Sequence, residues 1–187
     1  MAETDLIELL LQDHKAAEEL LGQVGQPGRD QAELFHDIVH DLVGHEVAEE
    51  EIVYPAVRSE VPGGDVLADA RIGEQQTAEE LMAKMEDMDT SSAEFSQSLT
   101  KLRDEALAHA KAEEAEVFPK LREALSPDRR QQLGAAYQTA KATAPTHPHP
   151  HAPNTPPGNV AAGSIAAIGD RVRDAARSAM QKLHSHH

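Results

Sequence analysis

Four segments of the chain repeat one polar pair, a histidine or glutamine followed four residues later by a glutamate, after two apolar residues at helical spacing. The pairs are His14 and Glu18, His45 and Glu49, Gln75 and Glu79, and His109 and Glu113. They begin at positions 14, 45, 75 and 109, so the intervals of 31, 30 and 34 residues each accommodate one helix and a loop. This spacing predicts an all-α, antiparallel, up-down-up-down four-helix bundle in which the four pairs meet at one level of the core.

Glycine, proline and cap residues divide residues 1–142 into the predicted helices. We expect helices from a Thr4 cap to about Leu21, from about Asp30 to Val61, from about Asp65 to Met88, from about Ala93 to Leu125, and from Ser126-Pro127 onward. The predicted organisation is a bundle over 1–125, an accessory helix over 126–142, a Pro/His-rich linker over 143–159, and a C-terminal helix with a histidine-rich end over 160–187. That last helix has a weak alanine-rich stripe, which leaves the bundle, a protein partner and a membrane surface open as docking partners.

Composition excludes several classes of protein. The chain has no cysteine, which rules out iron–sulfur clusters, thiolate zinc sites, disulfides and cysteine nucleophiles. With a formal charge of −16, the chain lacks the basic surface that binding to nucleic acid requires. The opening segment has no basic lead, and no apolar run approaches the length of a membrane span. We therefore expect a cytoplasmic protein that binds neither nucleic acid nor the membrane interior.

The charge inside the predicted bundle points to metal. Buried carboxylates without a counter-charge cost several kcal/mol or become protonated, and no lysine or arginine shares their inward faces. Carboxylate and imidazole ligands suit iron, manganese or zinc, and five to seven ligands exceed what one tetrahedral site needs. One such pair alone is more often solvated, and helix one has an equally good apolar face that leaves Glu18 outside. A ferritin-like site would need two Glu-x-x-His motifs, and the chain offers one, at 33–36.

Three segments carry a resemblance to a known family: Asp13-His14, the run HEVAEEEIVYP from His45, and the run HAKAEEAEVFP from His109. Each run contains His-x-x-x-Glu-Glu and an aromatic-proline pair that begins nine residues after the histidine. Over about residues 5–125 the chain resembles the hemerythrin, or HHE cation-binding, domain, and its layout is most similar to the hemerythrin-like proteins of mycobacteria and their relatives.

The resemblance implies a bundle that holds a non-haem diiron centre, with the two iron ions joined by an oxo or hydroxo bridge and by carboxylate bridges. On the matching positions, the implied ligands are His14, His45, Glu49, His109 and Glu113, with the two glutamates as bridges. The chemistry implied for the mycobacterial group is reaction with peroxide or nitric oxide. Glu18, Gln75, Glu79 and Glu114 are further candidate ligands in this chain.

The third helix departs from the family pattern. Hemerythrins place histidine there, whereas this chain has Gln75 followed by Glu79, or Gln76 one residue later. A metal site with few imidazole ligands and many oxygen-atom ligands disfavours reversible carriage of dioxygen, because anionic oxygen ligands stabilise the oxidised metal. This departure favours reaction with peroxide or nitric oxide.

Tyr54 is the candidate catalytic residue. On a straight helix it lies about half a turn from His45, which is typical of a packing residue. Pro55 disrupts the helical hydrogen bonds, and local rewinding would bring the phenol toward the metals, to hydrogen-bond or to ligate. Phe118 at the matching place has no hydroxyl.

We therefore expect a catalase-like or peroxidase-like diiron protein; the alternatives are a non-enzymatic oxygen, redox or iron sensor, and an iron storage or delivery protein.

Overall fold

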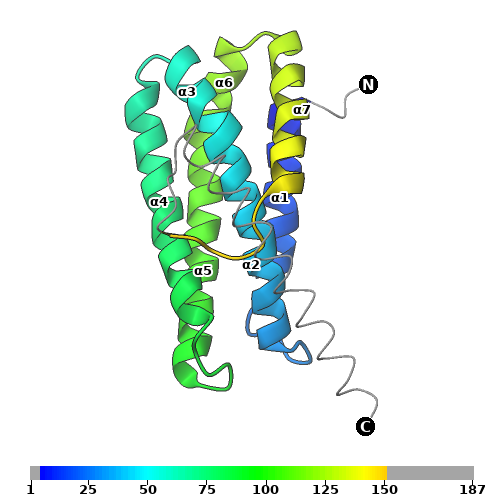
Figure 1. Cartoon of the computed structure of the whole chain (residues 1–187), viewed down its shortest axis with the longest axis vertical. Coiled ribbons are helices and arrows are strands. Elements are labelled where there is room, and N and C mark those ends of the chain that lie inside the picture. Colours follow the sequence, from blue (N-terminus) through cyan, green and yellow to red (C-terminus); the bar gives the residue numbers. More distant parts are fainter. Residues whose placement is uncertain (1–4, 151–187) are drawn as a thin grey trace.

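A computed structural model describes residues 5–150, and every regular element in that range is helical (Figure 1). The elements are α1 (Leu6–Leu21), α2 (Gln31–Ala48), η1 (Glu49–Val53), α3 (Tyr54–Glu60), α4 (Gly64–Met85), α5 (Ala93–Ala112), η2 (Glu113–Val117), α6 (Phe118–Ala124) and α7 (Pro127–Thr143), where η marks a π-helix. The predicted all-α bundle is confirmed. Its four rods are α1, the continuous α2–η1–α3, α4, and the continuous α5–η2–α6, and α7 packs beside them as a fifth helix. No helix in the described part of the chain has the length and apolar character needed to cross a membrane.

Side-chain caps fix where the helices begin. The prediction of a Thr4 cap is wrong, because the carboxylate of Asp5 accepts the Ile7 N–H and caps α1 instead. Ser92 and Ser126 cap α5 and α7 by accepting the backbone N–H groups of Phe95 and Arg129, which agrees with the predicted helix starts at about Ala93 and at Ser126-Pro127.

Two π-helices interrupt the second and fourth rods directly before Tyr54-Pro55 and Phe118-Pro119. A proline has no backbone N–H to donate, and its ring clashes with the carbonyl four residues earlier. A widened turn accommodates both the missing hydrogen bond and the ring. From the sequence we predicted a disrupted helix at Pro55 but an uninterrupted helix through Pro119. A π-helix absorbs one residue, so Tyr54 lies roughly 80° around the helix from His45 instead of about 180°.

The core consists of two apolar clusters. One surrounds Tyr54 and Phe118, and the other surrounds Phe35 and Phe95. On every rod, the histidine or glutamine of the predicted polar pair lies in the sequence between residues of the two clusters. The polar level of the bundle is therefore enclosed by apolar packing at both ends.

Helix α7 is held against α1, α2 and η1 by packing and by ion pairs. Arg130 Nε contacts Asp5 Oδ2 at 2.7 Å, and Lys141 Nζ contacts Asp13 Oδ2 at 2.9 Å. Beyond α7 the chain crosses α2 toward α4 (Figure 1), and His147 Nδ1 contacts Glu86 Oε1 there at 2.5 Å. The remainder of the predicted linker and the predicted C-terminal helix lie outside the described residues.

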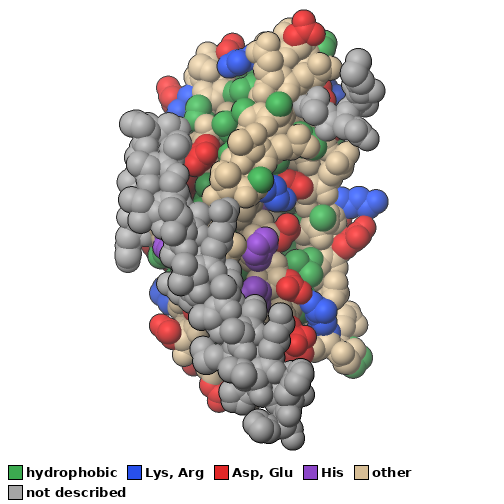
Figure 2. Space-filling model, turned by 45° about the vertical axis from the view of Figure 1, so that its right-hand side comes forward, with side chains coloured by type: hydrophobic (Ala, Val, Ile, Leu, Met, Phe, Trp, Pro, Cys, Tyr) green, Lys and Arg blue, Asp and Glu red, His purple; other side chains and the backbone are tan. Residues whose placement is uncertain are grey.

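Acidic side chains are scattered over the face seen in Figure 2 and alternate with lysine and arginine. This arrangement agrees with an acidic surface that keeps the protein hydrated.

Candidate metal centre

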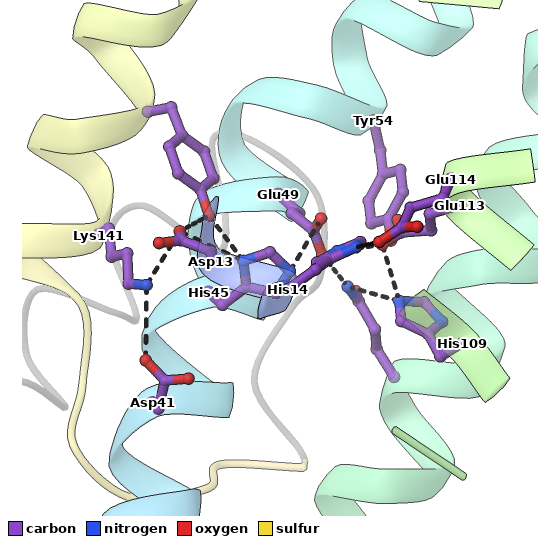
Figure 3. A network of polar contacts seen from close by, with 12 residues as sticks. Asp13, His14, Asp41, His45, Glu49, Tyr54, His109, Glu113, Glu114 and Lys141 are labelled. Carbon is purple, nitrogen blue, oxygen red and sulfur yellow. Dashed lines mark hydrogen bonds and ion pairs between the residues drawn. The ribbon is translucent and has the colours of Figure 1, made fainter. Parts of the chain in front are cut away.

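Four buried side chains converge at the polar level of the bundle (Figure 3). They are His14 from α1, His45 from the last turn of α2, and Glu49 and Glu113, which begin η1 and η2. One ligand atom from each lies within 4.8 Å of the corresponding atoms of the others. Both glutamates have no exposed surface, so their charges need a partner inside the core.

His109 and Gln75 border this cluster. His109 Nε2 lies 3.4 Å from Glu113 Oε2. The amide nitrogen of Gln75 donates to Glu49 Oε2 at 2.6 Å and lies 3.5 Å from His109 Nε2. The third rod thus supplies a hydrogen-bond donor to a carboxylate at the place where a family member would offer an imidazole.

The facing atoms are suited to a cation. His14 Nε2, Glu49 Oε1 and Glu113 Oε2 are buried and make no hydrogen bond. His14 Nε2 lies 3.3 Å from Glu113 Oε2 and His45 Nε2 lies 3.2 Å from Glu49 Oε1, without hydrogen-bond geometry. Buried polar atoms are normally satisfied, and a set of imidazole nitrogens and carboxylate oxygens that face one another fits a transition-metal ion.

Without metal, protons carry the compensating charge. Burial lowers the pKa of His45, but the nearby carboxylates of Glu49 and Asp13 outweigh it, so the pKa stands well above its usual value. Burial raises the pKa of Glu113, but the facing imidazoles of His14, His109 and His45 bring it down to about 2. The metal-free centre therefore favours imidazolium–carboxylate pairs, and a metal ion would displace their protons.

Each of the three histidines has an acceptor at its Nδ1 atom. His14 Nδ1 lies 3.0 Å from Glu114 Oε1, and His109 Nδ1 lies 2.9 Å from Glu74 Oε2. His45 Nδ1 lies 2.7 Å from the hydroxyl of Tyr137. Such partners orient metal-binding imidazoles and leave Nε2 to face the metal.

Tyr54, the first residue of α3, contacts the candidate centre through its hydroxyl. Its hydroxyl donates to Glu113 Oε1 at 2.8 Å, and the residue is 1% exposed. Burial and the negative charges of Glu113 and Glu49 raise its pKa well above the usual value, so the phenol keeps its proton in the metal-free protein. Of the roles predicted for Tyr54, the structure shows the hydrogen bond. Phe118 instead packs on the His14 ring at 5.2 Å between centroids.

Three of the predicted ligands lie outside the cluster. Glu18 is exposed on α1, because the buried face of that helix is the one that carries Leu10, His14 and Leu21. Glu79 accepts the backbone N–H of His149 at 2.8 Å. Glu114 is at the edge of the bundle, where it contacts the outer nitrogen of His14.

Sequence reasoning missed the contributions of Glu74 and Tyr137. Glu74 immediately precedes Gln75 and is fixed by Arg71 Nη2 at 2.9 Å, a pattern that does not stand out in a chain with 33 acidic residues. Tyr137 had a clearer signal. The chain has two tyrosines, and the structure brings both hydroxyls to the ligands of one centre.

A cavity of about 390 Å³ adjoins the cluster on the side away from Tyr54. Its wall includes His14, His45, Gln75 and His109, together with small and aliphatic residues such as Ala17 and Leu42. A small molecule in this cavity would meet three imidazoles, four glutamate side chains and a largely apolar surface.

Comparison with known proteins gives a consistent result. The model of the hemerythrin HHE cation-binding domain matches residues 5–121. An uncharacterised hemerythrin-like protein of Schizosaccharomyces pombe is 31% identical over 140 residues, which are 74% of this chain and 69% of that protein. A DNA nickase of Nostoc sp. is 29% identical over 136 residues, which are 72% of this chain but 38% of the nickase. No solved structure matches significantly.

Proposed function

The chain belongs to the hemerythrin HHE cation-binding domain family, and on this basis we propose that it is a cytoplasmic non-haem diiron protein that detoxifies peroxide. One observation supports this proposal above the others. Three imidazoles and two carboxylates face one another in the core, with acceptor atoms left without hydrogen bonds, beside a cavity large enough for a small oxidant.

His14, His45 and His109 would be the terminal ligands, and Glu49 and Glu113 would bridge. Iron bound there would supply two-electron redox chemistry to a small oxygen species. The residues around it have separate tasks: Gln75 and Tyr54 each hold one carboxylate oxygen by a hydrogen bond, at 2.6 and 2.8 Å.

Peroxide is favoured over oxygen carriage by the third rod. Gln75 uses its N–H on Glu49 and leaves the site short of one imidazole compared with the family pattern. A set rich in carboxylate stabilises the oxidised metal and so disfavours reversible oxygen release. Disproportionation of two hydrogen peroxide molecules to two waters and one dioxygen balances without any further reductant. Nitric oxide is the second candidate substrate, and its reduction needs an electron donor.

The test is oxygen evolution by the iron-loaded full chain after addition of hydrogen peroxide, measured with an oxygen electrode. We expect catalytic evolution by the wild type and its loss, together with iron, in His45→Ala and Glu49→Ala. His40→Ala is the matched control, because His40 is exposed on the same helix. Wild-type iron content in both site variants would contradict the assignment of the centre.

The alternative functions predict different results in these experiments. A sensor would react with peroxide stoichiometrically, without sustained oxygen evolution, and deletion of 144–187 would abolish its signalling while the centre persists. A storage protein would take up more iron than two ions per chain. Anaerobic consumption of nitric oxide by the reduced protein would favour the second substrate. The nickase match does not extend to a proposal on DNA, because it covers 38% of that protein and this chain carries a charge of −16.

A further inference from the structure

Helix α7 begins at Pro127, beyond the residues that match the family model, yet one of its side chains reaches the candidate centre. Tyr137 is 1% exposed, and its hydroxyl lies 2.7 Å from His45 Nδ1. His14 and His109 have carboxylates in the same role, and both of those carboxylates are about half exposed, at 43% of the side chain. The acceptor of His45 is therefore distinctive in its chemistry and in its burial.

The hydrogen bonds fix which way the protons point. The Tyr137 hydroxyl donates its single proton to Asp13 Oδ2 at 2.7 Å. Its oxygen is then left to accept, so His45 carries a proton on Nδ1. When a metal ion displaces the proton on Nε2, the Nε2 lone pair is directed inward. Nε2 lies 3.2 Å from Glu49 Oε1. Lys141, also on α7, holds Asp13 Oδ2 at 2.9 Å and completes the chain of contacts.

We propose that Tyr137 is a positioning residue for His45, and that α7 thereby becomes part of the metal centre. The hydroxyl sets the tautomer and ring orientation of His45, and the Lys141–Asp13 pair holds the hydroxyl in place. Packing alone does not account for the residue. A phenylalanine would fill the same apolar cluster, whereas a buried phenol needs the partners that Asp13 and His45 provide. The inference rests on the proposed function only in that His45 must bind metal.

Removing the hydroxyl alone is not a decisive test. Asp13 Oδ2 already lies 3.6 Å from His45 Nδ1 and can close that gap in a Tyr137→Phe protein. The decisive variant is Tyr137→Phe combined with Asp13→Ala, because it removes both acceptors while alanine preserves α1. Thr139→Val is the matched control on α7, since its hydroxyl contacts the Ala135 carbonyl on the surface. Asp41→Ala is a second control, which removes the other carboxylate near Lys141 and spares Asp13.

The probe is Zn²⁺, which is redox-silent and diamagnetic, added to the metal-free full chain. Chelator competition should show affinity about tenfold to a hundredfold weaker in the double variant, and unchanged affinity in both controls. In NMR spectra of the zinc-loaded wild type, His45 should show an Nδ1–H resonance protected from exchange, and the double variant should lose that protection. Wild-type affinity and a protected resonance in the double variant would overturn the inference. If His45→Ala also bound Zn²⁺ like the wild type, the proposed centre itself would be at fault.

Discussion

The hydroxyl of Tyr54 donates a hydrogen bond to Oε1 of Glu113 at 2.8 Å, and so links the residue that follows one π-helix to the residue that begins the other. Without the widened turn of η1, Tyr54 would face about 180° from His45 and could not make this contact. The two π-helices therefore place a phenol and a carboxylate on the same side of the candidate centre. Such turns occur frequently at functional sites.

Tyr54→Phe should destabilise the metal-free protein by about 1–3 kcal/mol, because it leaves a fully buried carboxylate oxygen without its donor. The measurement is the free energy of unfolding in urea, with helical content checked by circular dichroism. Ser59→Ala, which removes an exposed hydroxyl from the same helix, should change little. Equal stability of the two variants would show that the hydrogen bond to Glu113 contributes nothing.

Much of this arrangement follows from residue spacing. The four polar pairs predict a bundle because a helix and a loop have a characteristic combined length, and the observed rods confirm that fold. Spacing also indicates which residues share a level, and the structure brings His14, His45, Glu49 and Glu113 together at that level. It does not determine the rotation of each helix. On α1 two faces fit equally well, and packing selects the one that leaves Glu18 in solvent.

Other features depend on contacts that no local pattern encodes. The π-helix before Pro119 changes the register of the fourth rod by one residue, and the same proline could equally have produced a kink. Tyr137 lies 92 positions from His45 in the sequence, so their contact depends on how α7 docks. Asp5 caps α1, and its carboxylate also binds Arg130, a residue of the distant α7 that no local pattern at the start of α1 reveals.

Gln75→Glu should destabilise the metal-free protein and make it depend more strongly on metal. It would set a second carboxylate against Glu49, at a position where the two side chains now approach to 2.6 Å. Two carboxylates so close cannot both ionise readily without a cation between them. We expect a lower melting temperature without metal at neutral pH, and a larger rise on adding Zn²⁺ or Fe²⁺ than in the wild type.

Gln76→Glu is the control for this change, because it adds the same charge at an exposed position one residue away. It should leave both melting temperatures close to those of the wild type. If Gln75→Glu also behaved in this way, the amide of Gln75 would have no role in holding Glu49.

The metal-free protein should be most stable between about pH 4.5 and 6.5, and metal should bind more weakly as the pH falls. The pKa of Glu113 is lowered to about 2 from 4.5, so its contribution is present above pH 4.5 and is lost as the pH falls toward 2. The pKa of His45 is raised above 6.5, so its contribution is complete below pH 6.5 and is lost as the pH rises through the raised value. Burial and the charge of Glu79 raise the pKa of Glu46 well above 4.5, so its contribution is complete below pH 4.5 and is lost as the pH rises through the raised value, which moves the maximum toward the acidic end of this range.

Thermal melting of the metal-free protein across this range is the measurement. Metal binding should release protons, because the imidazolium forms cannot bind a cation, and the apparent affinity should fall by up to about tenfold per pH unit for each proton displaced. A melting temperature that rises steadily through neutral to alkaline pH would contradict the assignment of charged His45 to the metal-free centre.

Asp5→Ala should both shorten α1 and loosen α7. The carboxylate accepts the Ile7 N–H with one oxygen and contacts Arg130 Nε at 2.7 Å with the other. Loss of the cap costs about 0.5–2 kcal/mol, and loss of a surface ion pair adds about 0.2–1 kcal/mol. Burial raises the pKa of Asp5, but the bonds from Arg130 and the backbone outweigh it and lower the pKa below 3.8. Its contribution is thus present above pH 3.8 and is lost as the pH falls.

Asp30→Ala is the matched control, because Asp30 caps α2 by accepting the N–H groups of Ala32 and Glu33, and its carboxylate forms no ion pair within residues 5–150. The difference between the two losses of unfolding free energy therefore reports the Arg130 contact. Since α7 carries Tyr137, Asp5→Ala should also accelerate exchange of the backbone amides of α7, and Asp30→Ala should not. Equal exchange in both variants would mean that packing alone keeps α7 beside His45, without help from the Asp5–Arg130 pair.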